Sequence, residues 1–489
     1  MKKNIIKISL AALTVFVSLT SCDRNTDQFS SINEPVDQAM SRPESFRQAL
    51  DGAYTSMKEV GYYRSDTGSQ LIIGDLTTDN LVRCAAGRNS NFAASTFEFA
   101  ADNSQTTGLF NPAYLAISRA NFVLANIDNG VLKGADRAKV EAEAVAIRAM
   151  IHFDLVRAYC KIPTQSPDAA NSMGIYYAEK YNPLGSGGSR SLTVAQVYDK
   201  IIADLTFALN NIPVTPAQTN SRDAGRLTKS AVYGLLSRVC LYKGDYAKTI
   251  EYGDLSLSGY SSRTSLAEFP NLWKSTSTDG VLFQILNGAS EPTVTVGVAY
   301  NQFLGGQYRS EFVPDYNLYT SYTADDVRKE SYFLTAPYNG KTYNHIIKYS
   351  GNGGPASVVP IKYLRTAEVV LNVAEAAYKT GDMTKALTLL NSLRQQRYKS
   401  YTPGTETGTA LLDAIYKQRR LELAFENDRW YTLKRLALGV QRSGKGDLAD
   451  GTGTVPSVQT LPASSTKWQW PLPINAIQAN PAIQQNPGY

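Results

Sequence analysis

The densest group of reactive side chains lies in QRRLELAFENDRWYTLKRL, residues 418–436. On a helix, Glu422 and Glu426 are four residues apart and share a face. Two such carboxylates could serve as the acid and base of glycoside hydrolysis. On the same helix Arg419 would pair with Glu422, and Arg429 with Glu426. Because a nearby guanidinium keeps a carboxylate ionised, whereas a general acid needs a raised pKa, we interpret the cluster as structural and predict no catalytic residues.

No other reaction chemistry is indicated. The sequence has no nucleophile elbow, HExxH helix, complete phosphate-binding loop or dinucleotide fingerprint. Its two histidines, His152 and His345, and its four widely spaced cysteines form neither a metal-ligand motif nor a disulfide framework. We therefore predict no metal and no cofactor. We expect His152, on an apolar helix, to be a core residue, and Cys160 and Cys240 to be buried free thiols.

The N-terminal segment has the layout of an export signal. Lysines precede a short apolar run from Ile8 to Leu19, which is too short to span a bilayer. The run ends in Leu-Thr-Ser-Cys, which resembles a bacterial lipobox. The sequence predicts a signal peptide at 1–21, lipidation of Cys22 and a polar tether over 22–38. The alternative is an ordinary signal followed by a chance cysteine.

The composition of the exported chain argues against nucleic acid as a partner. Loss of residues 1–21 removes three lysines, which takes the formal charge from +6 to +3. So small an excess gives no basic surface of the kind that binds nucleic acid. The chain has 30 tyrosines, which suit surfaces that bind ligands as well as seams between helices.

Helical periodicity dominates the scaffold. Apolar residues recur at helical spacing from about residue 43 and again through 110–158. Two similar segments, 231–257 and 364–393, each read as a helix, a Gly-Asp turn and a second helix. Such helix pairs resemble tetratricopeptide units, which stack on one another. We predict a mainly α fold, with a tetratricopeptide-like helix-pair scaffold.

An irregular, loop-rich layer with a few short strands completes the expected fold. Two stretches have β-like character, VLFQILNG from Val281 and VTVGVAY from Val294. No Pro/Ser-rich linker divides the chain, so we predict one domain over 39–489. The loop-rich inserts are expected near 60–108, 160–192, 259–360 and 440–489.

Several motifs together are similar to one family. KYLRTAEVVLNVAEAAYKTGD (362–382) and QRRLELAFENDRW (418–430) resemble conserved helices of the SusD/RagB outer-membrane lipoproteins. AYLAISRANFVLANI (113–127), EAEAVAIRAMIHFDLVRAYCKIP (141–163) and the closing WQWPLPINAIQANPAIQQNPGY (468–489) resemble other segments of that family, in the same order. With the lipobox, the resemblance covers essentially the whole exported chain.

The resemblance implies a lipid-anchored protein on the outside of the outer membrane. It would capture oligosaccharides and deliver them to a SusC-type TonB-dependent transporter, without catalysis. Two alternatives stay open: the same architecture could load peptides, or the protein could be a surface glycosidase.

Candidate ligand residues follow from the chemistry of sugar recognition. Aromatic rings stack on the C–H faces of a sugar, and planar polar groups bind its hydroxyls. Two loop regions offer this mixture, and the resemblance places ligand contacts in about the same two regions. The candidates are Asp79, Arg83, Arg88, Asn91, Phe92, Tyr300, Phe303, Tyr308, Arg309, Tyr316 and Tyr319.

Overall fold

The computed structural model forms two compact units, residues 1–47 and 48–489. The helix α3 (Pro43–Thr55) begins in the first unit and ends in the second. No helix in the described part of the chain is long and apolar enough to cross a membrane. The described residues are 39–64, 69–183, 188–213, 224–258, 264–287 and 296–489.

The predicted signal peptide (1–21), the tether (22–38) and the lipidated Cys22 lie outside the described residues. These boundaries, and the single domain over 39–489, stay predictions.

The larger unit is mainly α-helical, as predicted. Its longest helices are built from the amphipathic segments, and the shorter ones lie in the loop-rich regions. The helices are α4 (Gln70–Leu76), α5 (Phe92–Ser95), α6 (Ser104–Thr107), α7 (Phe110–Ala125), α8 (Gly134–Tyr159), α9 (Val194–Asn211), α11 (Lys229–Lys243), α12 (Tyr246–Ser258), α13 (Phe269–Trp273), α14 (Val296–Tyr300), α15 (Tyr316–Thr320), α16 (Val327–Tyr332), α17 (Thr366–Lys379), α18 (Met383–Gln395), α19 (Gly408–Glu422), α20 (Arg429–Arg435) and α21 (Ile474–Ala479).

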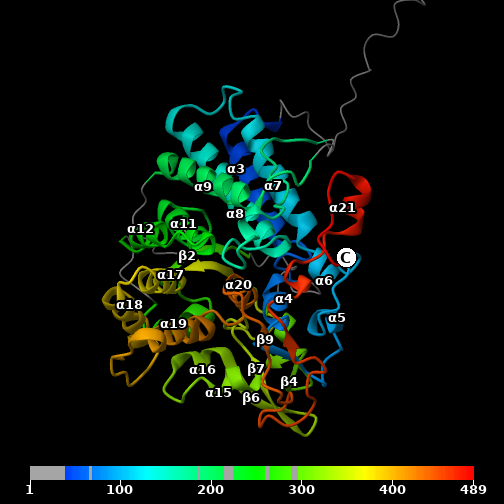
Figure 1. Cartoon of the computed structure of the whole chain (residues 1–489), viewed down its shortest axis with the longest axis vertical. Coiled ribbons are helices and arrows are strands. Elements are labelled where there is room, and N and C mark those ends of the chain that lie inside the picture. Colours follow the sequence, from blue (N-terminus) through cyan, green and yellow to red (C-terminus); the bar gives the residue numbers. More distant parts are fainter. Residues whose placement is uncertain (1–38, 65–68, 184–187, 214–223, 259–263, 288–295) are drawn as a thin grey trace, which may run out of the picture. The chain divides into compact units, whose positions relative to one another are not determined.

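Two helix pairs form the predicted tetratricopeptide-like scaffold. In Figure 1, α11 and α12 lie beside α17 and α18, and α12 contacts α17. Gly244 and Gly381 follow the first helix of each pair, with positive φ angles of 85° and 89° that glycine adopts without strain. Asp245 and Asp382 then accept hydrogen bonds from backbone N–H groups of the next helix. The Gly-Asp turn therefore ends one helix and starts the other.

His152, Cys160 and Cys240 are buried, as predicted from the sequence. His152 is fully buried; its Nδ1 donates to the carbonyl of Arg148, 2.8 Å away, and its Nε2 accepts from the N–H of Ala178. Burial lowers the pKa of His152 to about 3, so the ring is neutral. Cys160 and Cys240 are buried free thiols, as is Cys84.

Within the described residues, the strands form five separate two-stranded antiparallel pairs. They are β1 (Leu81–Arg83) with β5 (Phe312–Pro314), β2 (Val281–Ile285) with β8 (Ile361–Arg365), β3 (Asn301–Leu304) with β4 (Gln307–Ser310), β6 (Phe333–Tyr338) with β7 (Lys341–Ile346), and β9 (Val440–Gln441) with β10 (Thr460–Leu461). Strand β2 confirms the prediction for VLFQILNG.

The predicted strand VTVGVAY is wrong, because its described part forms helix α14. Packing overrides the β propensity of its valines. A Cβ on Gly297 would lie 2.6 Å from the carbonyl oxygen of Pro355, so only glycine allows this close approach. The helical turn also carries Tyr300 into the interior, where its hydroxyl donates to the carbonyl of Leu71.

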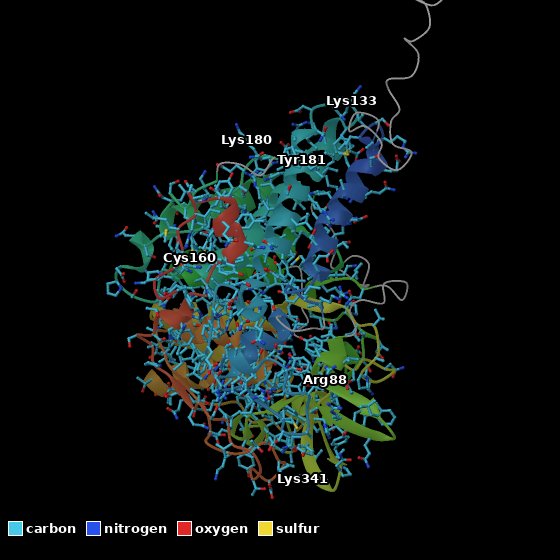
Figure 2. All side chains as sticks on the ribbon, turned by 90° about the vertical axis from the view of Figure 1, so that its right-hand side faces the viewer. Arg88, Lys133, Cys160, Lys180, Tyr181 and Lys341 are labelled. Carbon is cyan, nitrogen blue, oxygen red and sulfur yellow. The ribbon has the colours of Figure 1, made fainter. Side chains whose placement is uncertain are left out.

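One end of the larger unit consists of long helices, whereas the other combines short strands with short helices such as α15 and α16. Strands β4, β6 and β7 gather at the bottom of Figure 1, whereas α7, α8 and α9 lie at the top. Figure 2 shows Arg88 and Lys341 at the end with the strands, and Lys133 and Lys180 at the other. The two predicted ligand loops are thus carried on the end with the strands.

Packing between the helix pairs gives a first testable prediction. A Cβ on Gly253 of α12 would lie 2.2 Å from Cγ2 of the buried Val373 in α17. Gly253→Ala should therefore lower the free energy of unfolding in urea by about 1–3 kcal/mol, because the core has no room for the methyl group.

The matched control is Gly52→Ala in α3, where the nearest atom would be 3.8 Å away. There alanine should stabilise the helix by up to about 1 kcal/mol. Equal stability of the two variants would contradict the close packing of α12 on α17.

Candidate functional site

The carboxylate of Glu422 is the centre of a buried ion-pair network. It is fully buried and lies 2.8 Å from Nη1 of Arg365 and 2.8 Å from Nε of Arg397. Arg328 Nη1 lies 3.3 Å away. Burial would raise the pKa of Glu422, but Arg397 and Arg365 outweigh this effect and hold the pKa well below its usual value. Glu422 therefore stays ionised and cannot act as a general acid.

The predicted pairing along a single helix is wrong in detail. Helix α19 ends at Glu422, and Phe425 and Asn427 have positive φ angles of 67° and 61°. Because the backbone turns here, Glu426 instead pairs with Arg365 at 2.6 Å and Lys348 at 2.7 Å.

The neighbouring arginines find other partners. Arg419 binds Asp428 at 2.6 Å, and Arg429 binds Asp79 at 2.7 Å. The motif is a structural network, as interpreted, but most of its ion pairs join it to other segments of the chain.

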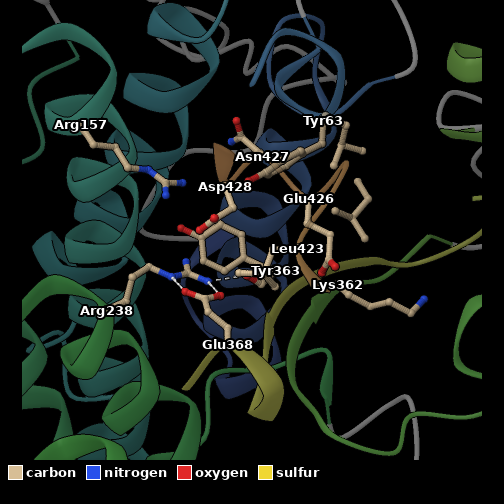
Figure 3. A pocket seen from close by; sticks show the side chains of 12 residues that line it. Tyr63, Arg157, Arg238, Lys362, Tyr363, Glu368, Leu423, Glu426, Asn427 and Asp428 are labelled. Carbon is tan, nitrogen blue, oxygen red and sulfur yellow. Dashed lines mark hydrogen bonds and ion pairs between the residues drawn. The ribbon is translucent and has the colours of Figure 1, made fainter. Parts of the chain in front are cut away.

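A small polar cavity lies against this network (Figure 3). Arg238 and Glu368, which form an ion pair at 2.6 Å, line it together with Tyr63, Lys362 and Asp428. Its volume of about 20 Å³ is room for about one water molecule. It is too small for a sugar ring, so it cannot be the predicted ligand site.

Asp79 anchors the first predicted ligand loop to the network. Its two carboxylate oxygens accept from Nε and Nη2 of Arg429, each at 2.7 Å, and Arg420 pairs with it at 3.2 Å. Burial would raise the pKa of Asp79, but Arg429 and Arg420 outweigh this effect and lower it. Asp79 therefore holds the turn that leads into β1, and its carboxylate is engaged.

Glu311 ties the first loop to the second. Its carboxylate accepts from the backbone N–H of Arg88 at 2.9 Å, from Nε of Arg88 at 2.7 Å and from Ser90 at 3.0 Å. Burial would raise the pKa of Glu311, but these hydrogen bonds lower it. Arg309 also donates to the carbonyl of Ala86, at 3.0 Å. The two loops, more than 200 residues apart in sequence, thus meet at Glu311.

A third segment, residues 442–458, joins them. Asp447 accepts from the backbone N–H groups of Ala85 and Thr454, each at 2.7 Å. Beneath these loops lies a small apolar cluster of Val82, Cys84, Val313 and Tyr343, with Leu448 packed against it. The three loops therefore share a core of their own.

These loops enclose an open cavity of about 210 Å³, here called the Arg83 cavity. Arg83 and Phe92 line it, with the guanidinium carbon of Arg83 5.0 Å from the centre of the Phe92 ring. Phe92 is 45% exposed, so part of its side chain can contact a ligand. The other lining residues are Leu76, Leu81, Val82, Cys84, Ala85, Ser95, Arg442, Thr454, Val455, Pro456 and Ser457.

Of the predicted ligand residues, the structure brings only Arg83 and Phe92 to this cavity. Arg88 and Arg309 join the loops to each other. The fully buried Tyr300 and the engaged Asp79 have little surface to offer a ligand. The ligand role of the whole set stays a prediction.

The remaining candidates lie around the cavity without lining it. Asn91 is buried at the start of α5. Phe303 is 57% exposed on β3, and the ring centre of Tyr308 lies 5.0 Å from that of Phe303. Tyr316 lies against Gly451, and Tyr319 packs against Phe333 with 5.3 Å between ring centres.

Sequence reasoning missed two features of the site. The run Thr454–Ser457 lines the Arg83 cavity, but only its place in the expected loop-rich segment 440–489 marked it. A second open cavity of about 320 Å³ lies between α7, residues 176–182 with Gly188, and the α21 segment, with Tyr114 and Tyr176 in its wall. No predicted ligand residue lines this second cavity.

Comparisons with known proteins agree with this architecture. Residues 282–489 match the family model described as SusD family, and residues 30–241 match the model described as starch-binding associating with outer membrane. The chain belongs to the SusD-like family. A SusD-like relative, SusD-like protein P2 from Formosa agariphila, is 28% identical over 466 residues, which covers 83% of this chain and 87% of the relative.

Solved SusD structures have the same fold. A SusD superfamily protein from Bacteroides thetaiotaomicron is 24% identical with a TM-score of 0.77, over 91% of this chain and all of the other. A putative sugar binding protein from Bacteroides vulgatus is 25% identical with a TM-score of 0.77, over 92% of this chain and 99% of the other. The helix-pair scaffold with loops is therefore the SusD fold.

The Glu422 network gives a second prediction. Glu422→Gln keeps the shape of the side chain but leaves three guanidinium groups without their shared carboxylate charge. The free energy of unfolding in urea should fall by about 3–5 kcal/mol.

Glu251→Gln is the control, because its carboxylate is half exposed and pairs only with Lys248. That change should cost under about 0.5 kcal/mol. A similarly small loss for Glu422→Gln would mean that the network does not hold the fold together.

Proposed function

We propose that this SusD-like protein captures oligosaccharides at the outer-membrane surface and delivers them to a SusC-type TonB-dependent transporter. The observation that carries the proposal is the open Arg83 cavity. It combines the partly exposed side chain of Phe92 with hydroxyl groups at Ser95, Thr454 and Ser457. Sugar binding needs this mixture of a flat apolar surface and hydrogen-bonding groups.

The membrane location and the transporter follow from the family rather than from the cavity. One matched model is described as associating with the outer membrane, and Leu-Thr-Ser-Cys ends the apolar N-terminal run. Lipidation of Cys22 would anchor the chain on the outer surface.

We expect the lipidated protein to co-purify with a SusC-type transporter from detergent-solubilised outer membranes, and a Cys22→Ser variant to leave the membrane fraction.

A binding role without turnover is part of the proposal. Glu422 and Glu426, the carboxylates weighed as an acid/base pair, are engaged in buried ion pairs away from the Arg83 cavity. Product release from an oligosaccharide during incubation would instead establish a surface glycosidase.

Calorimetric titration of the unlipidated chain against oligosaccharides and mixed peptides tests the proposal. We expect saturable binding of an oligosaccharide class without cleavage. Phe92→Ala should weaken that binding by about 5- to 30-fold, because a stacked aromatic ring is worth roughly 1–2 kcal/mol.

Phe207→Ala is the matched control. Phe207 lies on α9 and is 39% exposed, similar to Phe92, but it is not part of the Arg83 cavity. Binding of peptides alone would replace oligosaccharides with peptides as the cargo. Equal losses in the two variants would place the ligand away from the Arg83 cavity.

A further inference from the structure

The Arg83 cavity contains two guanidinium groups that no carboxylate neutralises directly. Nε of Arg83 is buried and has no hydrogen-bond partner among the described residues. Its guanidinium lies against the Phe92 ring instead. Two other arginines, Arg157 and Arg435, also have an unpartnered Nε, but each is ion-paired through its other nitrogens, to Asp154 and Glu375. The unpaired charge therefore sets Arg83 apart from them.

Arg442 adds a second positive charge to the same cavity. Its guanidinium donates to the carbonyl oxygens of Leu76, Thr78, Ser95 and Val458 at 2.5–3.1 Å. The carbonyl oxygens accept its hydrogen bonds but carry no net charge, so they do not neutralise the guanidinium. Burial lowers the pKa of Arg442 to about 10, a value at which it is still charged near neutral pH.

The carboxylates closest to these two arginines are committed to other groups. Glu311, which faces Arg83, binds Arg88 and Ser90. Asp79 binds Arg429 and Arg420.

The two remaining carboxylates nearby accept from backbone N–H groups. Asp447 binds Ala85 and Thr454, and Asp315 binds Asn317 and Ser443. Among the described residues, Arg83 thus has no carboxylate bound to its guanidinium and no partner for its Nε, while the rest of the cavity wall is mostly apolar or carries hydroxyl groups.

We propose that the Arg83 cavity selects oligosaccharides that carry an anion, either the carboxylate of a uronic acid or a sulfate ester, and that Arg83 pairs with that anion. The inference rests on the proposed function and names the ligand class of the same site. A guanidinium presents a planar fork of N–H donors that matches carboxylate and sulfate oxygens. A neutral sugar would leave that charge without a counterion in a partly dry site.

The size of the cavity fits one charged sugar unit. Its volume of about 210 Å³ is below the ~300–1,000 Å³ of pockets that enclose a whole ligand. One sugar unit would place its ring on Phe92 and its anion on Arg83, while the rest of the oligosaccharide stays outside.

The test compares three probes on the mature chain with Cys22→Ser: a galacturonate oligosaccharide, a sulfated carrageenan oligosaccharide and a neutral malto-oligosaccharide. Calorimetric titration is run in low and high NaCl. We expect one charged probe to bind more tightly than the neutral one, with affinity that falls as NaCl rises. The better charged probe identifies the anion as carboxylate or sulfate.

Variants assign the effect to Arg83. Arg83→Gln should weaken binding of the charged probe by roughly 10- to 100-fold, the value of a charge-assisted hydrogen bond, and should weaken binding of the neutral probe less. Arg83→Lys should retain part of the preference for the charged over the neutral probe.

Arg137→Gln is the control, because Arg137 is ion-paired with Asp128 and Glu141 at the start of α8. Urea unfolding confirms that each variant is folded.

The outcomes separate the inference from the proposed function. If only the neutral probe binds, or if Arg83→Gln leaves charged binding unchanged, the inference is wrong and oligosaccharide capture stands. If no oligosaccharide of a wide panel binds, the proposed function fails and the inference fails with it.

Discussion

The fold depends on one buried carboxylate, that of Glu422. It lies at the end of α19 and is shared by arginines from three other segments: Arg328 in α16, Arg365 at the end of β8 and Arg397 just after α18. Burying so many charges is costly unless each has its partners. Since every partner comes from a different element, all the ion pairs form only when those elements are packed correctly against one another.

The same motif positions the proposed ligand-binding loops. Arg420 and Arg429, at either end of QRRLELAFENDRW, hold Asp79 and so fix the turn before β1. Strand β1 pairs with β5, and Glu311, next to β5, holds the loop that follows β1. A continuous chain of ion pairs and backbone hydrogen bonds therefore runs from the buried network to the cavity. The backbone around the Arg83 cavity is thereby held in place by the buried network.

Local features of the sequence were enough to predict the scaffold. The Gly-Asp turns determine where α11 and α17 end, and their apolar periodicity determines which faces pack. Features that depend on distant partners could not be predicted in this way. Asp79 looked like a ligand residue because its type suits sugar binding, yet Arg420 and Arg429, more than 340 residues away, engage it. The hydroxyls of the Thr454–Ser457 run carry no signature that separates a ligand wall from an ordinary loop.

The arginines of this protein differ in what balances their charge, and that difference connects structure to function. Arg365 is balanced by the two carboxylates of Glu422 and Glu426, so it stabilises the fold. Arg442 is held by carbonyl oxygens, so it is fixed in place while its charge persists. Arg83 has an aromatic ring beside it and an orphaned Nε in an open cavity. Because a buried donor without a partner costs free energy, the Nε of Arg83 is the group that the proposed anion would complete.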